Sequence, residues 1–363
     1  MKIGIAGAGL LGRLLAFELA RAGHEVDVFD PAPGPDAHVA AGWTAAGMLS
    51  PVAELECAGE AVFALGLRSL ALWPRIVAAL DMPVELRQDG SLLLAHRADE
   101  GAARRVVSLL AAKAPAAHAP EALAPTALRE LEPAVQGPTL AWLLPCEGRI
   151  HTVQAMAALA AGAPARGARF HWGTPVAMAQ AGELRTPQGT ECFDWVFDVR
   201  GTGARLQLPV RGVRGEIFWL HAPGLGLHRP LRLLHPRHRV YLVPRQGDIV
   251  VVGASEIESE DRSPVSLRST VELLAAAHSV IPDLAEARIV HSESNLRPAL
   301  PDNLPRTETQ PGLTRINGLF RHGWLIAPAL VEDALIGCHA GLDPTSMLAR
   351  HDGLRVTPAM TAS

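Results

Sequence analysis

The sequence predicts an α/β protein built from more than one domain. Its 363 residues exceed what one ordinary hydrophobic core organises, so two domains are expected. The chain opens on a short apolar run, residues 3–6, and a glycine-rich turn separates this run from apolar residues at helical spacing. Much later, two β-rich runs are hinged at residues 246–248, as in a hairpin. These features predict a strand–turn–helix unit at the start and a β-rich region in the second half.

The segment KIGIAGAGLLGRLLAFELARAGHEVDVFD, residues 2–30, carries a G-x-G-x-x-G motif between a strand and a helix that stops at Gly23. In such a motif the first glycine allows a tight turn, the second lets the backbone approach a pyrophosphate, and the third permits close helix–strand packing. The free N–H groups of the helix N-terminus favour phosphates, and an acid ending the next strand accepts hydrogen bonds from ribose hydroxyls. The motif predicts a Rossmann-type dinucleotide site, NAD or FAD, at Gly7, Gly9, Leu10, Leu11, Gly12, Asp30 and Pro31.

Composition excludes several classes of function. A net charge of −4 and a pI near 6.4 provide no basic field for nucleic acid or an anionic membrane. The four cysteines form no CxxC pair and the 15 histidines form no HxxxH or HExxH, so we expect neither a disulfide framework nor a metal site. We see no signal peptide and expect no apolar segment of membrane-spanning length, which predicts a cytoplasmic protein.

The segment GWTAAGMLSPVAELE, residues 42–56, is small, glycine-rich and apolar where a plain NAD domain would continue its alternation of strands and helices. With the motif before it, this segment resembles the FAD-dependent amino acid oxidases, specifically glycine oxidase of the thiamine pathway in the D-amino acid oxidase superfamily. The resemblance implies a Rossmann-type FAD-binding domain with a second, mixed-sheet substrate domain. It places this segment against the flavin ring, through Thr44, Ala45, Ala46, Gly47 and Met48, with Met48 also near the substrate.

The resemblance continues along nearly the whole chain. The segment WGTPV implies that Val176 lies at the adenine, where a strand edge offers backbone hydrogen bonds, and DWVFDVRGTGAR implies a second glycine turn at Gly201. It divides the chain into an FAD-binding domain of residues 1–80, 140–208 and 295–345, a substrate domain of residues 81–139 and 209–294, and a peripheral tail, 346–363. Within the substrate domain, an alanine- and proline-rich stretch from residue 114 onwards reads as an exposed loop leading into a helix.

Three side chains carry the substrate prediction. Tyr241, the only tyrosine, lies in VYLVPR, and Arg297 lies in SNLRPALPDNLP. The resemblance implies that both bind the substrate carboxylate. A guanidinium fork matches a carboxylate, and a phenol adds a donor without adding charge. Arg321, in GLFRHGWLIAPALVEDAL, resembles the second arginine of the family's substrate pocket.

The segment around Arg321 has a second predicted role at the flavin. The loop Arg321, His322, Gly323, Trp324 and Leu325 would deliver backbone N–H groups to the flavin from the start of a helix whose first turn contains Pro328. Such a helix dipole stabilises the negative charge of a reduced flavin. Trp324 either narrows the pocket toward glycine or packs behind the loop.

Two further positions carry weaker expectations. Asn295 departs from the glycine common in the family, and we expect it to keep the turn because asparagine tolerates left-handed angles. Glu54 and Glu56 are more readily explained as solvated surface groups than as an attraction for the substrate ammonium.

The resemblance implies oxidation of glycine by hydride transfer to noncovalent FAD, with no catalytic acid or base. The products would be an imine or glyoxylate, ammonia and hydrogen peroxide, and O2 and a small amino acid would be the only partners required. A homo-oligomer and a thiazole-synthesis partner stay open. Two alternatives also stay open: an oxidase or dehydrogenase of another small D- or N-methyl amino acid (sarcosine, D-alanine or D-proline), and a non-catalytic nucleotide-binding protein.

Overall fold

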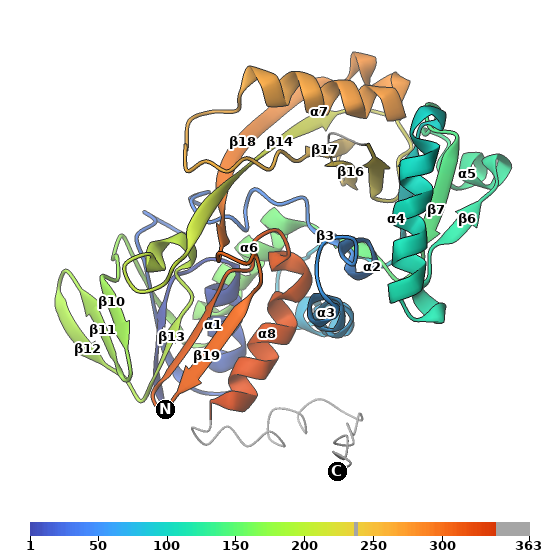
Figure 1. Ribbon diagram of the computed structural model, residues 1–363. Coiled ribbons are helices and arrows are strands. Elements are labelled where there is room, and N and C mark those ends of the chain that lie inside the picture. The colour runs from blue at the N-terminus through green and yellow to red at the C-terminus, as the bar shows by residue number, and fades with distance from the viewer. Residues whose placement is uncertain (236–238, 339–363) are drawn as a thin grey trace, which may run out of the picture.

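A six-stranded sheet with the order β19-β20-β13-β1-β2-β9 forms one part of the computed structural model, which describes residues 1–235 and 239–338 (Figure 1). Its strands are parallel except for β19, which pairs antiparallel with β20. The strands are β1 (Lys2–Ala6), β2 (Glu25–Asp30), β9 (Arg169–Trp172), β13 (Trp195–Asp198), β19 (Arg306–Gln310) and β20 (Leu313–Asn317). A small sheet of β10 (Met178–Gln180), β11 (Glu183–Thr186) and β12 (Gly189–Cys192) lies beside it.

The predicted strand–turn–helix unit is confirmed. β1 leads through the glycine turn into α1 (Leu10–Arg21), and the chain returns in β2, which ends at Asp30. Gly7 has φ +102°, and a Cβ there would lie 2.8 Å from the Val199 carbonyl oxygen. A Cβ on Gly12 would lie 1.8 Å from the Gly7 carbonyl oxygen, so α1 packs this closely on β1 only without a side chain. Gly23 follows the helix with φ +85°, as expected of a helix stop.

An eight-stranded mixed sheet forms the second part, with the order β18-β14-β17-β16-β15-β5-β7-β6. β15 pairs parallel with β5, and the other neighbours pair antiparallel. The strands are β5 (Ser91–Ala95), β6 (Glu121–Leu123), β7 (Leu140–Leu144), β14 (Arg211–His221), β15 (Leu231–Leu234), β16 (Arg239–Arg245), β17 (Ile249–Gly253) and β18 (Arg288–Ala299). The predicted hairpin joins β16 to β17, where Gly247 and Asp248 have positive φ angles of 76° and 56°.

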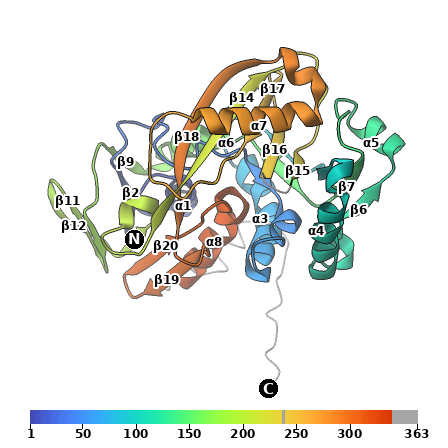
Figure 2. The ribbon, with the colours of Figure 1, turned by 45° about the horizontal axis from the view of Figure 1, so that its top comes forward.

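The two faces of the eight-stranded sheet have different neighbours. One face is covered by α7 (Leu267–Val280), which contacts β16 and β17 (Figure 2). Its Leu273 and Ala277 belong to the same buried cluster as Phe218 and Leu220 of β14. On the other, Ile217 joins a cluster that contains Ala46 and Met48 from the long connection after β2. Because successive side chains of a strand point to opposite faces, the odd-numbered residues of β14 near Ile217 face the six-stranded part and the even-numbered ones face α7.

The remaining elements connect or cover these sheets. A three-stranded sheet consists of β3 (Met48–Leu49), β8 (Gly148–Ile150) and β4 (Leu86–Arg87). The other helices are α2 (Pro51–Glu54), α3 (Glu60–Ala78), α4 (Glu100–Lys113), α5 (Pro125–Leu131), α6 (Thr152–Gly162) and α8 (Gly323–Gly337), and short 3-10 turns occur at 97–99, 116–118, 164–166, 201–204 and 282–286.

Several expected boundaries differ from these elements. Residues 140–144 form β7 in the eight-stranded sheet although we assigned them to the FAD-binding part, and β18 runs across the expected boundary at 295. The expected loop after residue 114 contains β6, which pairs with β7 before α5 begins. The division into two domains stays a prediction, and its segment 339–345 and the predicted tail 346–363 lie outside the described residues.

Helix α8 begins at Gly323, so Pro328 lies inside the helix and not in its first turn as predicted. A proline there lacks the N–H that would donate to the carbonyl of Trp324. The indole Nε1 of Trp73, on α3, donates to that carbonyl at 3.0 Å instead. Tertiary packing thus satisfies the group that the proline leaves open.

Helix α3 corrects the expectation that no apolar segment reaches membrane-spanning length. Its 19 residues are long and apolar enough by length and composition alone. In the structure this helix packs against α8: Trp73 stacks on Trp324 with ring centroids 5.5 Å apart, and Arg68 pairs with Glu332 and Asp333. These are the contacts of a helix in a folded core.

Candidate functional site

One cavity of about 1730 Å³ lies between the two large sheets and extends from the glycine turn of β1 to strands β14, β16 and β18. It exceeds the roughly 300–1,000 Å³ typical of small-ligand pockets, so it has room for a dinucleotide and a substrate together. All predicted site residues except Gly12 line it. They are Gly7, Gly9, Leu10, Leu11, Asp30, Pro31, Thr44, Ala45, Ala46, Gly47, Met48, Val176, Gly201, Tyr241, Arg297, Arg321, His322, Gly323, Trp324 and Leu325.

The glycine-turn end is shaped for a phosphate. Gly9 is the N-cap of α1 and has no side-chain cap, and a Cβ added to it would meet only the Ala40 Cβ, at 3.7 Å. The backbone is therefore open to a ligand at the helix N-terminus. The carboxylate of Asp30 accepts hydrogen bonds from the N–H groups of Ala8, at 2.6 Å, and Ala32, at 2.8 Å. These bonds fix the carboxylate and leave further lone pairs for hydroxyl donors.

Val176 lies at the cavity wall. We expected it at a strand edge, but it belongs to no strand. β9 ends at Trp172, and Pro175 has no N–H for a strand ladder. Nη1 of Arg200 donates to the Val176 carbonyl at 2.8 Å, while Nη2 pairs with Asp198 at 2.7 Å. Arg200 was missed by sequence reasoning, although it directly precedes the predicted Gly201.

The backbone of segment 44–48 is fixed by hydrogen bonds from two residues that we did not predict, Arg245 and Thr152. Nη2 of Arg245 donates to the carbonyls of Ala45, at 3.0 Å, and Ala46, at 3.2 Å. The Thr152 hydroxyl also donates to Ala45, at 2.9 Å. Gly47 has φ +78°, and a Cβ there would lie 2.0 Å from the Ile150 carbonyl oxygen, so only glycine fits.

Arg245 ends the VYLVPR segment that contains Tyr241, which was the available sequence signal for its role. Its guanidinium is buried, and burial lowers its pKa to about 10. Its partners include carbonyl oxygens of the segment 44–48. The buried Arg245 guanidinium and this segment therefore stabilise one another.

Tyr241 and Arg297 lie over two glycines on the cavity face of the eight-stranded sheet. A Cβ on Gly253 would lie 2.7 Å from the Tyr241 hydroxyl, and a Cβ on Gly215 would lie 2.5 Å from the Arg297 guanidinium carbon. Gly253 pairs with Ile217, two residues along β14 from Gly215, so the phenol and the guanidinium are neighbours on one face. Burial raises the pKa of Tyr241, against the effect of the nearby Arg297 charge. The sheet thus brings the two predicted carboxylate ligands together beside Met48.

Arg297 forms no ion pair with a carboxylate in the described part of the chain. Its Nη1 donates to the carbonyl of Ser255 at 3.0 Å and, more weakly, to that of Arg214 at 3.5 Å. Burial lowers its pKa, and the nearby Tyr241 and Glu256 offset this effect only in part. An anionic ligand in the cavity would supply further compensation.

Arg321 already pairs with two carboxylates, Glu54 and, at 3.4 Å, Glu256. Its Nη2 and Nε donate to Glu54 at 2.7 and 3.0 Å, and Arg232 donates to the other carboxylate oxygen at 3.0 Å. Glu54 is 8% exposed, so our expectation of a solvated surface group was wrong. Burial acts to raise its pKa, but Arg232, Arg321 and His322 hold the pKa well below its usual range. The geometry therefore favours Arg297 over Arg321 as the ligand of a substrate carboxylate.

The N-terminus of α8 meets the cavity as predicted, at Gly323 and with His322 as a cap that makes no side-chain hydrogen bond. Trp324 does not extend freely into the site. It is 4% exposed, stacks on Trp73, and donates from Nε1 to the Gly42 carbonyl at 3.0 Å. Of the two roles considered for it, packing behind the loop agrees with these contacts.

Asn295 lies within the extended strand β18 and not at a left-handed turn. Our expectation that asparagine replaces glycine in a turn here was therefore wrong. Its side-chain amide donates to the Ala40 carbonyl and the Thr44 hydroxyl, each at 3.2 Å. It therefore ties the strand that carries Arg297 to the segment that carries Met48.

Comparison with known proteins agrees with this geometry. Residues 2–333 match the family model described as FAD dependent oxidoreductase, DAO. The chain belongs to this family. FAD is its cofactor, and the structure fits FAD because the cavity has the necessary volume and because Gly9 leaves the backbone open at the N-terminus of α1. The dinucleotide motif alone had left NAD open.

Relatives within the DAO family extend over nearly the whole chain. A Rhizobium etli protein named as a thiamine biosynthesis oxidoreductase, ThiO, is 38% identical over 92% of this chain and 95% of its own. The glycine oxidase of Geobacillus kaustophilus is 29% identical over 97% of both chains. The crystal structure of a glycine oxidase from that organism superposes with a TM-score of 0.80, at 27% identity, and covers 97% of this chain and 99% of that one.

Proposed function

We propose that the protein oxidises glycine, with O2 as electron acceptor, and that it does so for thiazole synthesis in the thiamine pathway. The overall reaction takes glycine, O2 and water to glyoxylate, ammonia and hydrogen peroxide, or delivers the intermediate imine to a following enzyme. FAD, when bound, accepts the hydride from the substrate α-carbon. The observation that carries the proposal is Arg297, a partly buried guanidinium at the cavity wall with no carboxylate ion pair in the described residues, beside the only tyrosine of the chain.

The chain's own residues bind and orient the substrate. Nη1 of Arg297 is engaged by carbonyl oxygens, which leaves Nε and Nη2 as a fork for a carboxylate. Tyr241 adds a hydroxyl donor from β16, which is separated from β18 by β14 and β17 in the same sheet. A carboxylate held at two points on this sheet fixes the direction of the α-carbon, and such positioning is a large part of the catalytic effect when no proton transfer from carbon is needed. Met48 and Ile217 supply an apolar surface next to this site.

Relatives and local chemistry support the remaining parts. The printed names of glycine oxidase and ThiO support the substrate and the pathway. In the bifunctional ThiO/ThiG proteins of Trichormus variabilis and Nostoc, this chain matches 52% of the length, which supports a thiazole-synthesis partner for the protein. Residues 300–330 contain no cysteine, so we propose that FAD is bound noncovalently. We also propose that the reaction takes place in the cytoplasm.

An aerobic hydrogen peroxide assay with glycine, sarcosine, D-alanine and D-proline tests the proposal. We expect glycine to give the highest kcat/KM. A higher value with one of the others would replace glycine by that substrate. Flavin that stays oxidised with all four under anaerobic conditions would favour a non-catalytic nucleotide-binding protein.

The variant Arg297→Ala tests the carboxylate ligand. We expect kcat/KM for glycine to fall at least about 30-fold, equivalent to ~2 kcal/mol of lost charge-assisted binding, with the flavin content unchanged. Arg104→Ala is the matched control, because Arg104 is exposed on α4 and pairs only with Glu100 one turn earlier among the described residues. Full activity in Arg297→Ala would refute the carboxylate clamp, that is, the joint binding of the substrate carboxylate by Arg297 and Tyr241.

A further inference from the structure

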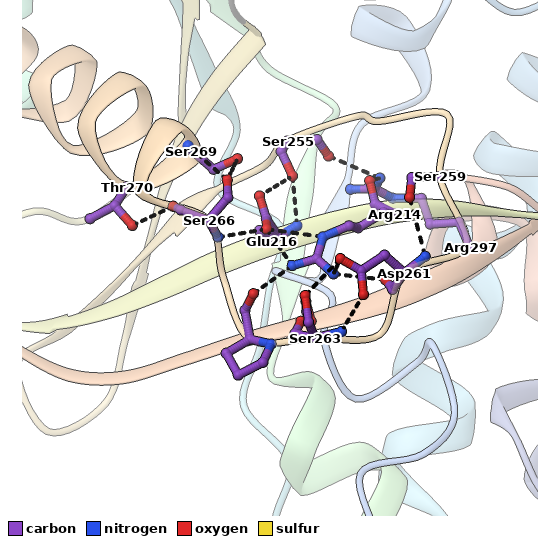
Figure 3. Close-up of polar contacts among 12 residues, drawn as sticks. Arg214, Glu216, Ser255, Ser259, Asp261, Ser263, Ser266, Ser269, Thr270 and Arg297 are labelled. Carbon is purple, nitrogen blue, oxygen red and sulfur yellow. Dashed lines mark hydrogen bonds and ion pairs between the residues drawn. The ribbon is translucent and has the colours of Figure 1, made fainter.

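A buried ion pair lies on the opposite face of β14 from the carboxylate site. Arg214 and Glu216 flank Gly215 in sequence, and their side chains are 4% and 0% exposed (Figure 3). Nη2 of Arg214 lies 2.6 Å from the Glu216 carboxylate and Nε lies 3.0 Å from it. Because neighbouring residues of a strand point to opposite faces, the pair faces α7 while the Gly215 position faces the cavity. The substrate carboxylate therefore does not touch this pair.

The pair organises the connection between β17 and α7, residues 254–266. The Arg214 guanidinium donates to the carbonyls of Asp261 and Pro264, each at 2.7 Å. Glu216 accepts from the N–H of Ser266 at 2.9 Å. Burial acts to raise the pKa of Glu216, but hydrogen bonds from Ser269, Arg214 and Ser266 outweigh it, and the pKa lies below its usual range. The carboxylate is thus kept charged by its partners in α7, in β14 and in the connection that it organises.

Ser255 connects this network with the cavity. Its hydroxyl donates to Glu216 at 3.1 Å and accepts from the Glu216 N–H at 2.9 Å. Its own N–H donates to the Glu216 carbonyl at 3.3 Å. Its carbonyl oxygen accepts from Nη1 of Arg297 at 3.0 Å, on the other face of the sheet (Figure 3). One residue is therefore fixed by Glu216 and in turn fixes the guanidinium.

We propose that Glu216, paired with Arg214, is a positioning residue for substrate binding and acts through Ser255 to set the orientation of Arg297. The inference rests on the proposed function, since it concerns the same carboxylate site. The physical reason is that Arg297 belongs to β18, the edge strand of its sheet, and no described carboxylate orients its long side chain. The Ser255 carbonyl holds Nη1, so that Nε and Nη2 present their two N–H groups to the substrate.

The variant Ser255→Ala tests this role, because it removes the hydroxyl and leaves the Arg214–Glu216 pair in place. We expect the dissociation constant of acetate, followed by the change in flavin absorbance, to rise about 5- to 20-fold. KM for glycine should rise by a similar factor and kcat should change less than threefold. Ser255→Thr restores a hydroxyl and should recover most of the acetate affinity. Ser263→Ala, which removes a hydroxyl of the same segment that donates to Asp261, is the matched control.

Two measurements separate positioning from general support of the fold. Glu216→Gln should raise the dissociation constant of acetate, as Ser255→Ala should. Both variants should keep the flavin content of the unmodified protein. Unchanged acetate binding in Ser255→Ala would overturn the inference. The inference would also fail if both variants lost acetate affinity only in proportion to a loss of bound flavin. If Arg297→Ala also binds acetate normally, the carboxylate clamp itself fails, which distinguishes the failure of the proposed function from the failure of this inference.

Discussion

At the scale of single residues, two glycines make room for the proposed substrate ligands. Gly215 and Gly253 carry no side chain where the guanidinium of Arg297 and the phenol of Tyr241 cross β14 and β17. Neither glycine has the positive φ angle that would itself demand glycine, so the requirement is space and not backbone conformation. Each proposed substrate ligand and the glycine that makes room for it belong to adjacent strands of one sheet.

Gly215→Ala should therefore disable the site without a change at Arg297 itself. A Cβ at 2.5–2.6 Å from three guanidinium atoms forces that side chain away from its present position. We expect kcat/KM for glycine to fall by at least about tenfold, equivalent to ~1.4 kcal/mol, with flavin content preserved. Gly101→Ala is the control, since its Cβ meets nothing within 4 Å and alanine favours a helix. Unchanged kcat/KM in Gly215→Ala would show that Arg297 can bind glycine from another position.

At the scale of elements, α6 is anchored by a histidine that must stay neutral. His151 is the N-cap of α6, and its Nδ1 accepts from the N–H of Gln154 at 3.4 Å and lies 3.2 Å from Nη1 of Arg245. Both donors meet the same nitrogen, so a proton there would remove the cap and face the Arg245 charge. Burial, with a further contribution from Arg245, lowers the pKa of His151 to about 4. The cap of this helix therefore depends on pH.

This dependence has a definite sign. The unfolded chain takes up a proton at His151 near pH 6.5, whereas the folded protein resists it until about pH 4. The contribution of neutral His151 to stability is thus fully present above pH 6.5 and is lost as the pH falls from 6.5 to 4. His151→Asn keeps a capping side chain that does not titrate. Thermal unfolding at pH 7 and pH 4.5 should show a smaller drop in Tm for this variant than for the unmodified protein or for His278→Asn on α7. An equal drop in all three would contradict the prediction.

The accuracy of prediction from sequence also differs between elements. β1, α1 and β2 follow from local signals, because the turn glycines, helical spacing and strand residues all lie within residues 2–30. The start of α8 was misplaced because Pro328 is tolerated inside the helix only through Trp73 of α3, which is distant in sequence. Arg245 and Arg200 were missed for a similar reason: among their partners are backbone carbonyls of segments distant in sequence, and such contacts leave no residue pattern.

At the scale of the whole molecule, Glu54 joins parts of the chain that are far apart in sequence. It lies at the end of α2 and binds Arg232 of β15, in the eight-stranded sheet, and Arg321, directly before the α8 segment that reaches the cavity. The motif that contains Arg321 was readable from the sequence, but its counter-ion was not, because nothing in residues 42–56 distinguishes Glu54 from Glu56. The two differ only after folding, when Glu54 becomes buried and Glu56 keeps a partly exposed side chain near Arg239.

Glu54→Ala should therefore destabilise the protein strongly, since it leaves two buried arginines without their shared anion. Breaking a buried pair in this way costs about 3–5 kcal/mol. Glu56→Ala is the matched control and should change the free energy of unfolding by less than about 1 kcal/mol, as expected for an exposed pair. Because the pKa of Glu54 is held well below its usual range, its contribution is present at neutral pH and is lost only as the pH falls below about 4. Urea unfolding at pH 7 measures both variants. Equal midpoints for Glu54→Ala and Glu56→Ala would mean that the two sheets are held together without this carboxylate.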